Sequence, residues 1–332
     1  MLGGSGVSRG IGVDLGECSA REVAAWSSGA LDAPLEHDAA LSVGVLRDEA
    51  LVLGAYQRAY GLPERWPLVR RASGGPEVRV GATSVYVGLS IPHPGAAPVA
   101  ADPRRIVNRA VRPLLRALTR AGCPAQFFGR DWVAVRHHPA AWVGFAHDST
   151  TQRTLFEAFV AVAVPFAVAE RSSFRGRSAG TLESLTGRSI DPGRLATAIV
   201  GSFVEACEAE PIAGGGLSRA STPTSVLEDP TRDPPWAATC SEAIGIVGAG
   251  PDGRGAFRVG GDLLVSRDAL ARLEERAAAA TELASDEALD AIVADALDSP
   301  RVALDGVRSL SSIRDVIARA LRRSPAPRSA RP

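Results

Sequence analysis

The sequence contains no lysine: all 37 of its basic residues are arginine, and they balance 37 aspartate and glutamate residues. A codon bias toward arginine explains this usage, but its consequence holds whatever the cause. No chemical step in this protein can use an amine from its own side chains. The balanced charge also gives no basis for non-specific binding to nucleic acid or to a membrane surface.

Cysteine pairs and long apolar runs are missing as well. The four cysteines are scattered, with no CxxC pair and no histidine at ligand spacing, so we expect free thiols and no metal site. The longest apolar run, residues 158–169, is interrupted by Pro165 and is too short to span a bilayer. Residues 1–4 do not begin a basic-then-apolar signal peptide. These absences predict a cytoplasmic protein.

The chain has 332 residues, which is too long for one ordinary core and suggests two domains. A hydrophobic content of 45% and a charged content of 22% are typical of soluble globular proteins. Stretches rich in glycine, proline and serine mark the boundaries. We expect a disordered N-terminus at 1–18, a core domain at 19–210, a linker at 211–236, a smaller domain at 237–323 and a disordered tail at 324–332.

Capping signals and periodicity predict the main elements. Ser19 and Glu22 form a capping box that starts a helix running to about Leu31. The apolar runs 41–46 and 50–53 flank a polar Arg-Asp-Glu and predict a hairpin. Two strands are expected within 125–146. Further helices are expected after Asp102-Pro103, after Asp191-Pro192 and near 267–280, 286–298 and 309–322, with strands at 240–247 and 256–265.

Residues 51–91 form the segment around which we expect the other elements of the core domain to be organised. Arg70 and Arg71 lead into a Ser73-Gly74-Gly75 turn, and strand-like runs lie on both sides of it. Glycines let a backbone approach a ligand closely, and N–H groups together with guanidinium groups can bind carboxylate or phosphate. The stretch therefore predicts a site for an acidic ligand.

Several segments, in this order, resemble the lipoate–protein ligases of the biotin/lipoate ligase superfamily. RRASGG after LVLGxxQ resembles the family's RRxSGGG segment, and Gly129-Arg130-Asp131 resembles its GRND. Gly144 and Ala146 match the G-x-A of its K-x-x-G-x-A. FRVGGDLLVSRDALARLEERA, which contains Gly261-Asp262-Leu263-Leu264, resembles the accessory domain that follows the bacterial ligase core.

The resemblance implies an α+β fold: a biotin/lipoate ligase-like core with a mostly antiparallel sheet and helices, then a small α/β accessory domain. It implies lipoate or octanoate as ligand, ATP and Mg²⁺ as cofactors if the protein is active, and a lipoyl-acceptor domain as partner. The residues that would bind the acyl group or its adenylate are Arg70, Arg71, Ser73, Gly74, Gly75, Gly129, Arg130, Asp131, Gly144 and Ala146.

Departures from the family pattern concern catalysis. The family lysine, which bridges the acyl carbonyl and the α-phosphate, falls on Ala141, and the third glycine of the loop is Pro76. The His-Asp that follows in many members is Arg79-Val80, and the family's paired histidines have no equivalent near Glu157. Two hypotheses follow. One is a ligase-like protein that binds acyl ligand and acceptor domain with altered or lost ligation. The other is an active ligase that uses Arg136 in place of the lysine.

The same residues also have purely structural interpretations. Arg70 and Arg71 could be a solvated strand end, and Ser73–Gly75 could be an ordinary turn. His137 and His138 are expected to be exposed beside Pro139, and Cys123 to be a small buried residue. We expect three tryptophans to pack in the core and not to stack on adenine: Trp66, Trp132 and Trp142.

Overall fold

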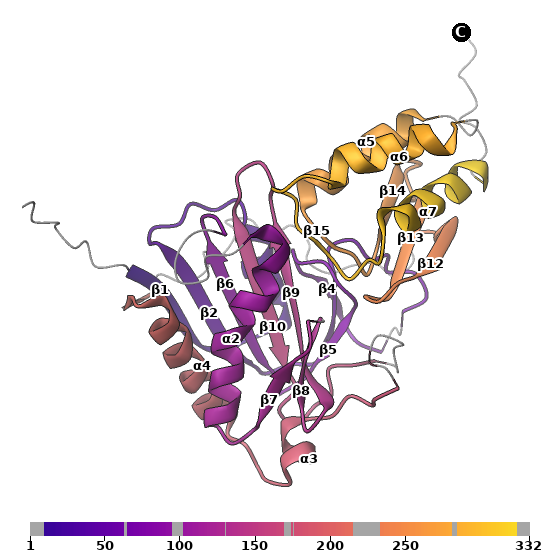
Figure 1. The fold of residues 1–332 in the computed structure, drawn as a ribbon. Coiled ribbons are helices and arrows are strands. Elements are labelled where there is room, and N and C mark those ends of the chain that lie inside the picture. The colour runs from indigo at the N-terminus through magenta and orange to yellow at the C-terminus, as the bar shows by residue number, and fades with distance from the viewer. Residues whose placement is uncertain are drawn as a thin grey trace, which may run out of the picture.

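A core domain with a large central sheet and a smaller domain packed against it make up the computed structural model of this chain (Figure 1). The structure describes residues 10–62, 65–94, 102–129, 131–168, 174, 176–214, 233–280 and 284–323. The predicted tail, most of the predicted linker and the first nine residues of the predicted N-terminal segment therefore lie outside the described residues.

The core is built on an eight-stranded mixed sheet with strand order β11-β1-β2-β6-β10-β9-β8-β7. Only β1 pairs in parallel, with β2 and with β11, so the sheet is mostly antiparallel, as predicted. The strands are β1 (Gly10–Cys18), β2 (Ala39–Leu46), β6 (Val85–Ile91), β7 (Ala125–Phe127), β8 (Trp132–Val135), β9 (His138–His147), β10 (Thr154–Val160) and β11 (Glu210–Ala213).

Both ends of the predicted core domain differ from the structure. Residues 10–18, predicted to be disordered, form β1, and β11 extends the core into the start of the predicted linker. Interspersed glycines obscure the alternation of β1, and its partner β11 lies about 200 residues away, so local patterning could not reveal the pair. The segment 125–146 also forms three strands, β7 to β9, where two were predicted.

Helices α2 (Ile106–Arg120) and α4 (Pro192–Cys207) cover one face of the sheet (Figure 1). Asp191 caps α4 by accepting a hydrogen bond from the Arg194 amide, and Asp102 caps a 3₁₀ turn, Pro103–Arg105, that leads into α2. The apolar face of α4 (Leu195, Ile199 and Phe203) is buried in a core cluster shared with α2 and the sheet. A short helix, α3 (Leu182–Thr186), precedes α4.

The other face carries α1 (Ala20–Gly29) and a second sheet of order β4-β3-β5, formed by Leu68–Arg70, Ala50–Leu53 and Val78–Val80. The Ser19–Glu22 capping box is present, as predicted. The predicted hairpin is wrong, because β2 and β3 belong to different sheets. Both edges of β2 are already paired, with β1 and β6, so β3 finds its partners in β4 and β5.

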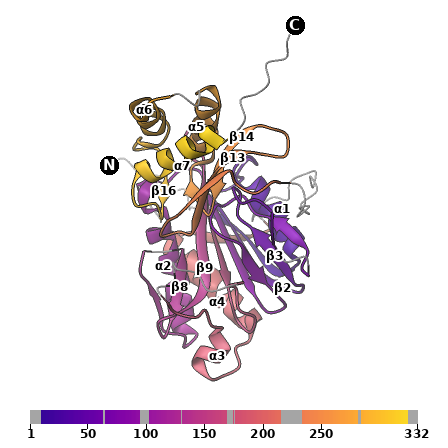
Figure 2. The same ribbon diagram turned by 90° about the vertical axis from the view of Figure 1, so that its right-hand side faces the viewer.

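The smaller domain packs three helices against a three-stranded antiparallel sheet (Figure 2). The predicted strand at 240–247 is wrong, because residues 242–245 form the turn between β12 (Ala238–Ser241) and β13 (Ile246–Pro251). The predicted strand at 256–265 is divided into β14 (Phe257–Gly261) and β15 (Leu264–Val265), and β15 pairs with β16 (Leu304–Asp305). The three predicted helices are present as α5 (Arg267–Ala279), α6 (Asp286–Leu297) and α7 (Leu310–Arg323).

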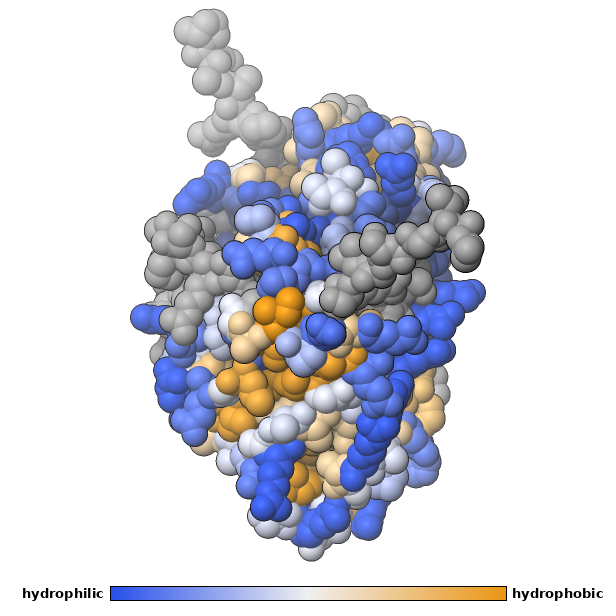
Figure 3. Space-filling model, turned by 90° about the vertical axis from the view of Figure 1, so that its left-hand side faces the viewer, coloured by the Kyte–Doolittle hydropathy of each residue, from blue (hydrophilic) through white to orange (hydrophobic). Residues whose placement is uncertain are grey.

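An apolar patch surrounded by polar residues lies on the side of the molecule that carries β1 and α4 (Figure 3). Leu15 of β1 and Ile212 of β11 are exposed at this edge of the sheet. Within the described part of the chain, no helix is long and apolar enough to cross a membrane.

Candidate functional site

The RRASGG segment connects β4 to β5 and forms a tight loop over the sheet face opposite α2 and α4. Gly75 has a φ of +86°, a conformation that favours glycine. A Cβ on Gly74 would lie 1.9 Å from the Leu263 carbonyl oxygen of the smaller domain. The loop thus needs its glycines for contact with the protein's own backbone.

All three loop N–H groups donate to acceptors within the protein. Ser73 N–H donates to the Glu157 carboxyl at 3.2 Å, Gly74 N–H to the Phe145 carbonyl at 3.3 Å and Gly75 N–H to the Leu263 carbonyl at 2.9 Å. A carboxylate or phosphate ligand would have to displace these acceptors before it could bind the loop backbone.

Arg71 is fully buried and holds the loop together. Its guanidinium donates to the carbonyls of Val52, Gly74 and Pro76 at 2.7–2.9 Å and to the Ser73 hydroxyl at 3.0 Å. It also lies 3.9 Å from the centre of the Trp142 ring. Arg71 is therefore not a solvated residue at the end of a strand. Its guanidinium N–H groups stabilise the fold of the loop.

Arg70 has a similar role in the neighbouring turn. It is half-buried, and its Nη1 donates to the carbonyls of Gly54, Ala55 and Gln57. Arg70 and Arg71, which were predicted to bind an acidic ligand, thus donate hydrogen bonds to backbone oxygens of the chain itself.

Glu157 is the residue at this site that sequence reasoning missed. It is completely buried on β10, where one carboxyl oxygen accepts the Ser73 amide and the other accepts the Tyr86 hydroxyl at 2.9 Å. Burial, together with the Glu157 charge, raises the pKa of Tyr86 well above its usual value. The signal was available: a lone charged residue inside the apolar run TLFEAFV must find partners, because an unpaired buried charge is costly.

Ala141, Gly144 and Ala146, the positions matched to K-x-x-G-x-A, do not all lie on the same face of the large sheet. Ala141 is buried in the cluster beneath α2 and α4, whereas Ala146 belongs to the cluster on the loop side. A Cβ on Gly144 would meet the Trp142 ring, which fills the loop side. Successive residues of a strand point to opposite faces, so a side chain at 141 points away from Ser73–Gly75.

Arg136 lies in the exposed turn between β8 and β9, with a φ of +48°. His137 and His138 beside it are exposed, as predicted. The predicted burial of Cys123 and of the three tryptophans is confirmed. The structure gives Arg136 no contact with the Ser73–Gly75 loop among the described residues.

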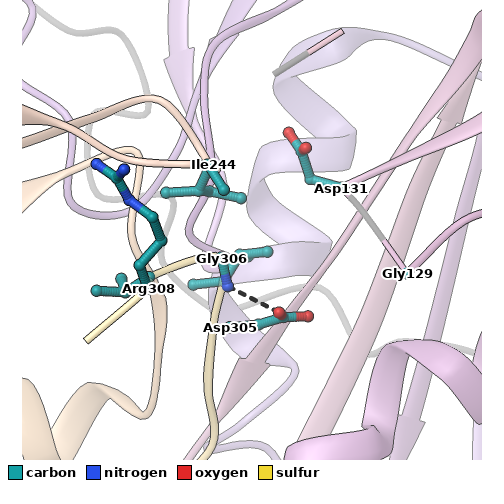
Figure 4. Close-up of a pocket in the computed structure, with 9 residues that line it drawn as sticks. Gly129, Asp131, Ile244, Asp305, Gly306 and Arg308 are labelled. Carbon is teal, nitrogen blue, oxygen red and sulfur yellow. Dashed lines mark hydrogen bonds between the residues drawn. The ribbon is translucent and has the colours of Figure 1, made fainter. Parts of the chain in front are cut away.

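Gly129 and Asp131 are separate from this loop. They form one wall of a cavity of about 210 Å³, and the smaller domain forms the other wall with Ile244, Gly306 and Arg308 (Figure 4). Asp131 is almost completely buried. Arg130, predicted to lie at the same site, is outside the described residues.

Among the described residues, neither a reactive thiol nor a metal cluster is evident. Burial raises the pKa of all four cysteine thiols, to about 12 for Cys18 and Cys207. In the ranges that the structure describes, no group of three or more His, Cys, Asp or Glu side chains could hold a metal ion. A thiolate nucleophile is therefore disfavoured at every cysteine.

No protein-family model and no curated protein sequence matches the chain. The crystal structure of P. falciparum LipL1 in complex with lipoate aligns with a TM-score of 0.60 at 11% identity. The alignment covers 93% of this chain and 98% of LipL1, so it spans both domains. The chain has the biotin/lipoate ligase fold.

Other proteins with this fold align less well. The bi-partite lipoate protein ligase of Thermoplasma acidophilum gives a TM-score of 0.48 at 16% identity, over 63% of this chain and 89% of that protein. An ATP-bound lipoate-protein ligase A gives 0.46 at 14% identity, over 63% and 90%. At these identities the likeness concerns the biotin/lipoate ligase fold and not its activity.

Proposed function

We propose that this chain binds a lipoyl-acceptor domain and, weakly, a lipoyl or octanoyl group, without ligating one to the other. The observation that carries the proposal is the internally bound loop: Ser73, Gly74 and Gly75 all donate their N–H groups to protein acceptors. The chain also has no lysine that could stabilise charge on an acyl-adenylate.

The binding part of the proposal is supported by the shared fold. LipL1, which spans nearly the same two-domain length, was crystallised with lipoate. An acyl ligand at Ser73–Gly75 would have to displace the Leu263 carbonyl or the Glu157 carboxyl, so we expect this chain to bind free lipoate weakly.

The described residues do not fit MgATP. The loop N–H groups that would hold an anion are bound within the protein, and the described residues offer no cluster of metal ligands. An arginine would be a poor replacement for the lysine, because a planar guanidinium does not reproduce a compact ammonium. Arg136 also lies in an exposed turn.

The test is the intact mass of an apo lipoyl-acceptor domain after incubation with this protein, MgATP and lipoate or octanoate. We expect no acyl adduct beyond a no-protein control, while calorimetry with the same acceptor domain detects binding. An adduct above the control would overturn the loss of ligation, and absence of acceptor binding would overturn the binding role.

The Ala141→Lys variant tests whether ligation is lost because the lysine is absent or because the loop N–H groups are already bound within the protein. Because Ala141 is fully buried on the helix side of the sheet, we expect the variant to remain without ligation and to unfold more readily. Its loss in unfolding free energy should be a few kcal/mol, by analogy with other buried unpaired charges. Ligation by this variant would show that the substitution at 141 alone had inactivated the protein.

A further inference from the structure

Helix α2 and the residues beside it are rich in arginine. Between residues 103 and 130 the sequence has seven arginines and no aspartate or glutamate, although the charge of the whole chain is balanced. Five of them follow one another at intervals of three and four residues and are called the arginine stripe: Arg105, Arg109, Arg112, Arg116 and Arg120. Because an α-helix has 3.6 residues per turn, these positions lie within roughly a quarter of the helix circumference.

The arginine stripe faces solvent along the whole of α2. Its five side chains are exposed, while the apolar face of the helix is buried against the large sheet (Figure 1). The helix has 15 residues, so the stripe extends over about 22 Å. Among the described residues, no large apolar side chain of α2 is exposed. A partner that docks on this face therefore meets positive charge and no apolar surface.

Ion pairs within the protein reach only one end of the arginine stripe. Glu205 of α4 pairs with Arg116 at 3.2 Å and with Arg120 at 2.6 Å. In the part of the chain that the structure describes, the other three arginines of the stripe form no ion pair. Three consecutive guanidinium groups of the stripe are thus available to an anion from outside the chain.

The arginine stripe does not stabilise the helix that carries it. Like charges three or four residues apart on a helix repel each other and destabilise it. Arg104 and Arg105 also lie at the amino-terminal end of α2, where the helix dipole favours negative charge. A partner that supplies negative charge along the stripe would relieve both effects, so the pattern favours binding over a role in stability.

We propose that the arginine stripe binds the phosphate backbone of double-stranded DNA without reading its base sequence. A planar guanidinium can donate two parallel hydrogen bonds to one phosphate, and each phosphate that is neutralised releases bound counterions. This binding goes beyond the proposed function and does not depend on it.

The exposed face of α2 favours DNA over other anionic partners. Helices that lie on membranes insert apolar side chains, and the centres of protein interfaces are rich in aromatic ones, whereas the described face of α2 exposes no large apolar group. The major groove of B-DNA is wide enough to admit a helix, but the major groove of A-form RNA is deep and narrow. Duplex DNA therefore fits a convex, purely charged helix face.

The experiment measures the fluorescence anisotropy of a labelled DNA duplex of about 20 base pairs as the full-length protein is added, from about 50 mM salt upward. Three unpaired arginines predict a slope of about −3 for the logarithm of the binding constant against the logarithm of the salt concentration. The triple variant Arg105→Gln/Arg109→Gln/Arg112→Gln should bind at least about tenfold more weakly and lose most of this slope. A duplex of different base sequence should bind equally well.

A matched control separates the arginine stripe from net charge. The triple variant Arg21→Gln/Arg254→Gln/Arg322→Gln removes three exposed arginines from α1, from the turn between β13 and β14, and from α7. It changes the net charge by the same amount and should keep the affinity and the slope. The stripe variant should also unfold at the same or a higher urea concentration than the unmodified protein, because repulsion within α2 is relieved. Its weaker DNA binding would then not result from unfolding.

Several results would overturn the DNA assignment. These are no DNA binding at about 50 mM salt, equal losses in the stripe and control variants, or tighter binding of duplex RNA than of duplex DNA. Stripe-dependent binding of phosphatidylserine vesicles or of the acceptor domain, without DNA binding, would assign the stripe to that partner instead. The ligation assay of the proposed function uses no DNA, so either proposal can fail while the other stands.

Discussion

Arg71 shows how one buried charged residue stabilises a fold through hydrogen bonds to oxygens of its own chain. A guanidinium buried in a protein interior must satisfy its donors, and Arg71 does so with three carbonyls and one hydroxyl from its own surroundings. Because three of these acceptors belong to residues 73–76, the arginine fixes the loop conformation. An arginine that looks like a ligand contact in the sequence is thus part of the framework of the site.

Arg71→Met should lower the free energy of unfolding by about 3 kcal/mol or more, because it leaves buried acceptors without donors. Urea denaturation followed by circular dichroism measures the loss. Arg21→Met is the matched control: Arg21 is exposed on α1, so its loss should change stability by less than about 0.5 kcal/mol. Equal losses for the two variants would contradict the framework role of Arg71.

At the scale of elements, the turn between β9 and β10 (residues 148–153) holds the start of α5. Asp268, in the first turn of α5, accepts the Ser149 amide at 2.7 Å and the Thr150 hydroxyl at 3.0 Å. Burial alone would raise the pKa of Asp268, but hydrogen bonds from Ser149, Arg272 and Thr150 together outweigh burial and lower this pKa to about 2. Arg267 binds Asp148 of the turn and Asp32 of the core.

Asp268→Asn should loosen the contact between the domains, because an amide replaces an acceptor of several hydrogen bonds. The Gly75 N–H, which donates to Leu263 of the smaller domain, should then exchange with deuterium at least about tenfold faster. Asp295→Asn, which removes an exposed ion pair with Arg276 inside the smaller domain, should leave that exchange unchanged. Unchanged exchange in both variants would show that other contacts hold the domains together.

At the scale of the whole molecule, a buried histidine makes the contact between the two domains sensitive to pH. His147 is completely buried at the end of β9, where one ring nitrogen pairs with the Thr154 hydroxyl at 2.8 Å. The other pairs with the Arg301 carbonyl of the smaller domain at 3.1 Å. Burial lowers the pKa of His147 below its usual value of 6.5. The folded protein therefore favours the neutral ring.

The free energy of unfolding should fall as the pH drops below about 6.5, because the unfolded chain takes up a proton that folded His147 resists. Denaturation midpoints across about pH 5.5 to 7.5 measure the slope. His147→Gln keeps a donor and an acceptor but does not titrate, so it should flatten the slope. An unchanged slope in His147→Gln would rule out this histidine as its source.

Local chemistry in the sequence determined the helices. Caps at Ser19 and Asp191 specified helices that the structure confirms, since capping and 3.6-residue periodicity act over a few residues. The collinear family segments also predicted the ligase fold, which the alignment with LipL1 confirms.

Tertiary structure alone decided what the site contains. Three features depend on contacts between residues that are far apart in the sequence: the pairing of β1 with β11, the pairing of both edges of β2, and the burial of Glu157 beneath the loop. Strand alternation was visible in the sequence, but the faces that Ala141 and Gly144 occupy became clear only when the packed layers were known. Hydrogen bonds from Ser73–Gly75 go to β9, β10 and the smaller domain because those groups are nearest in space.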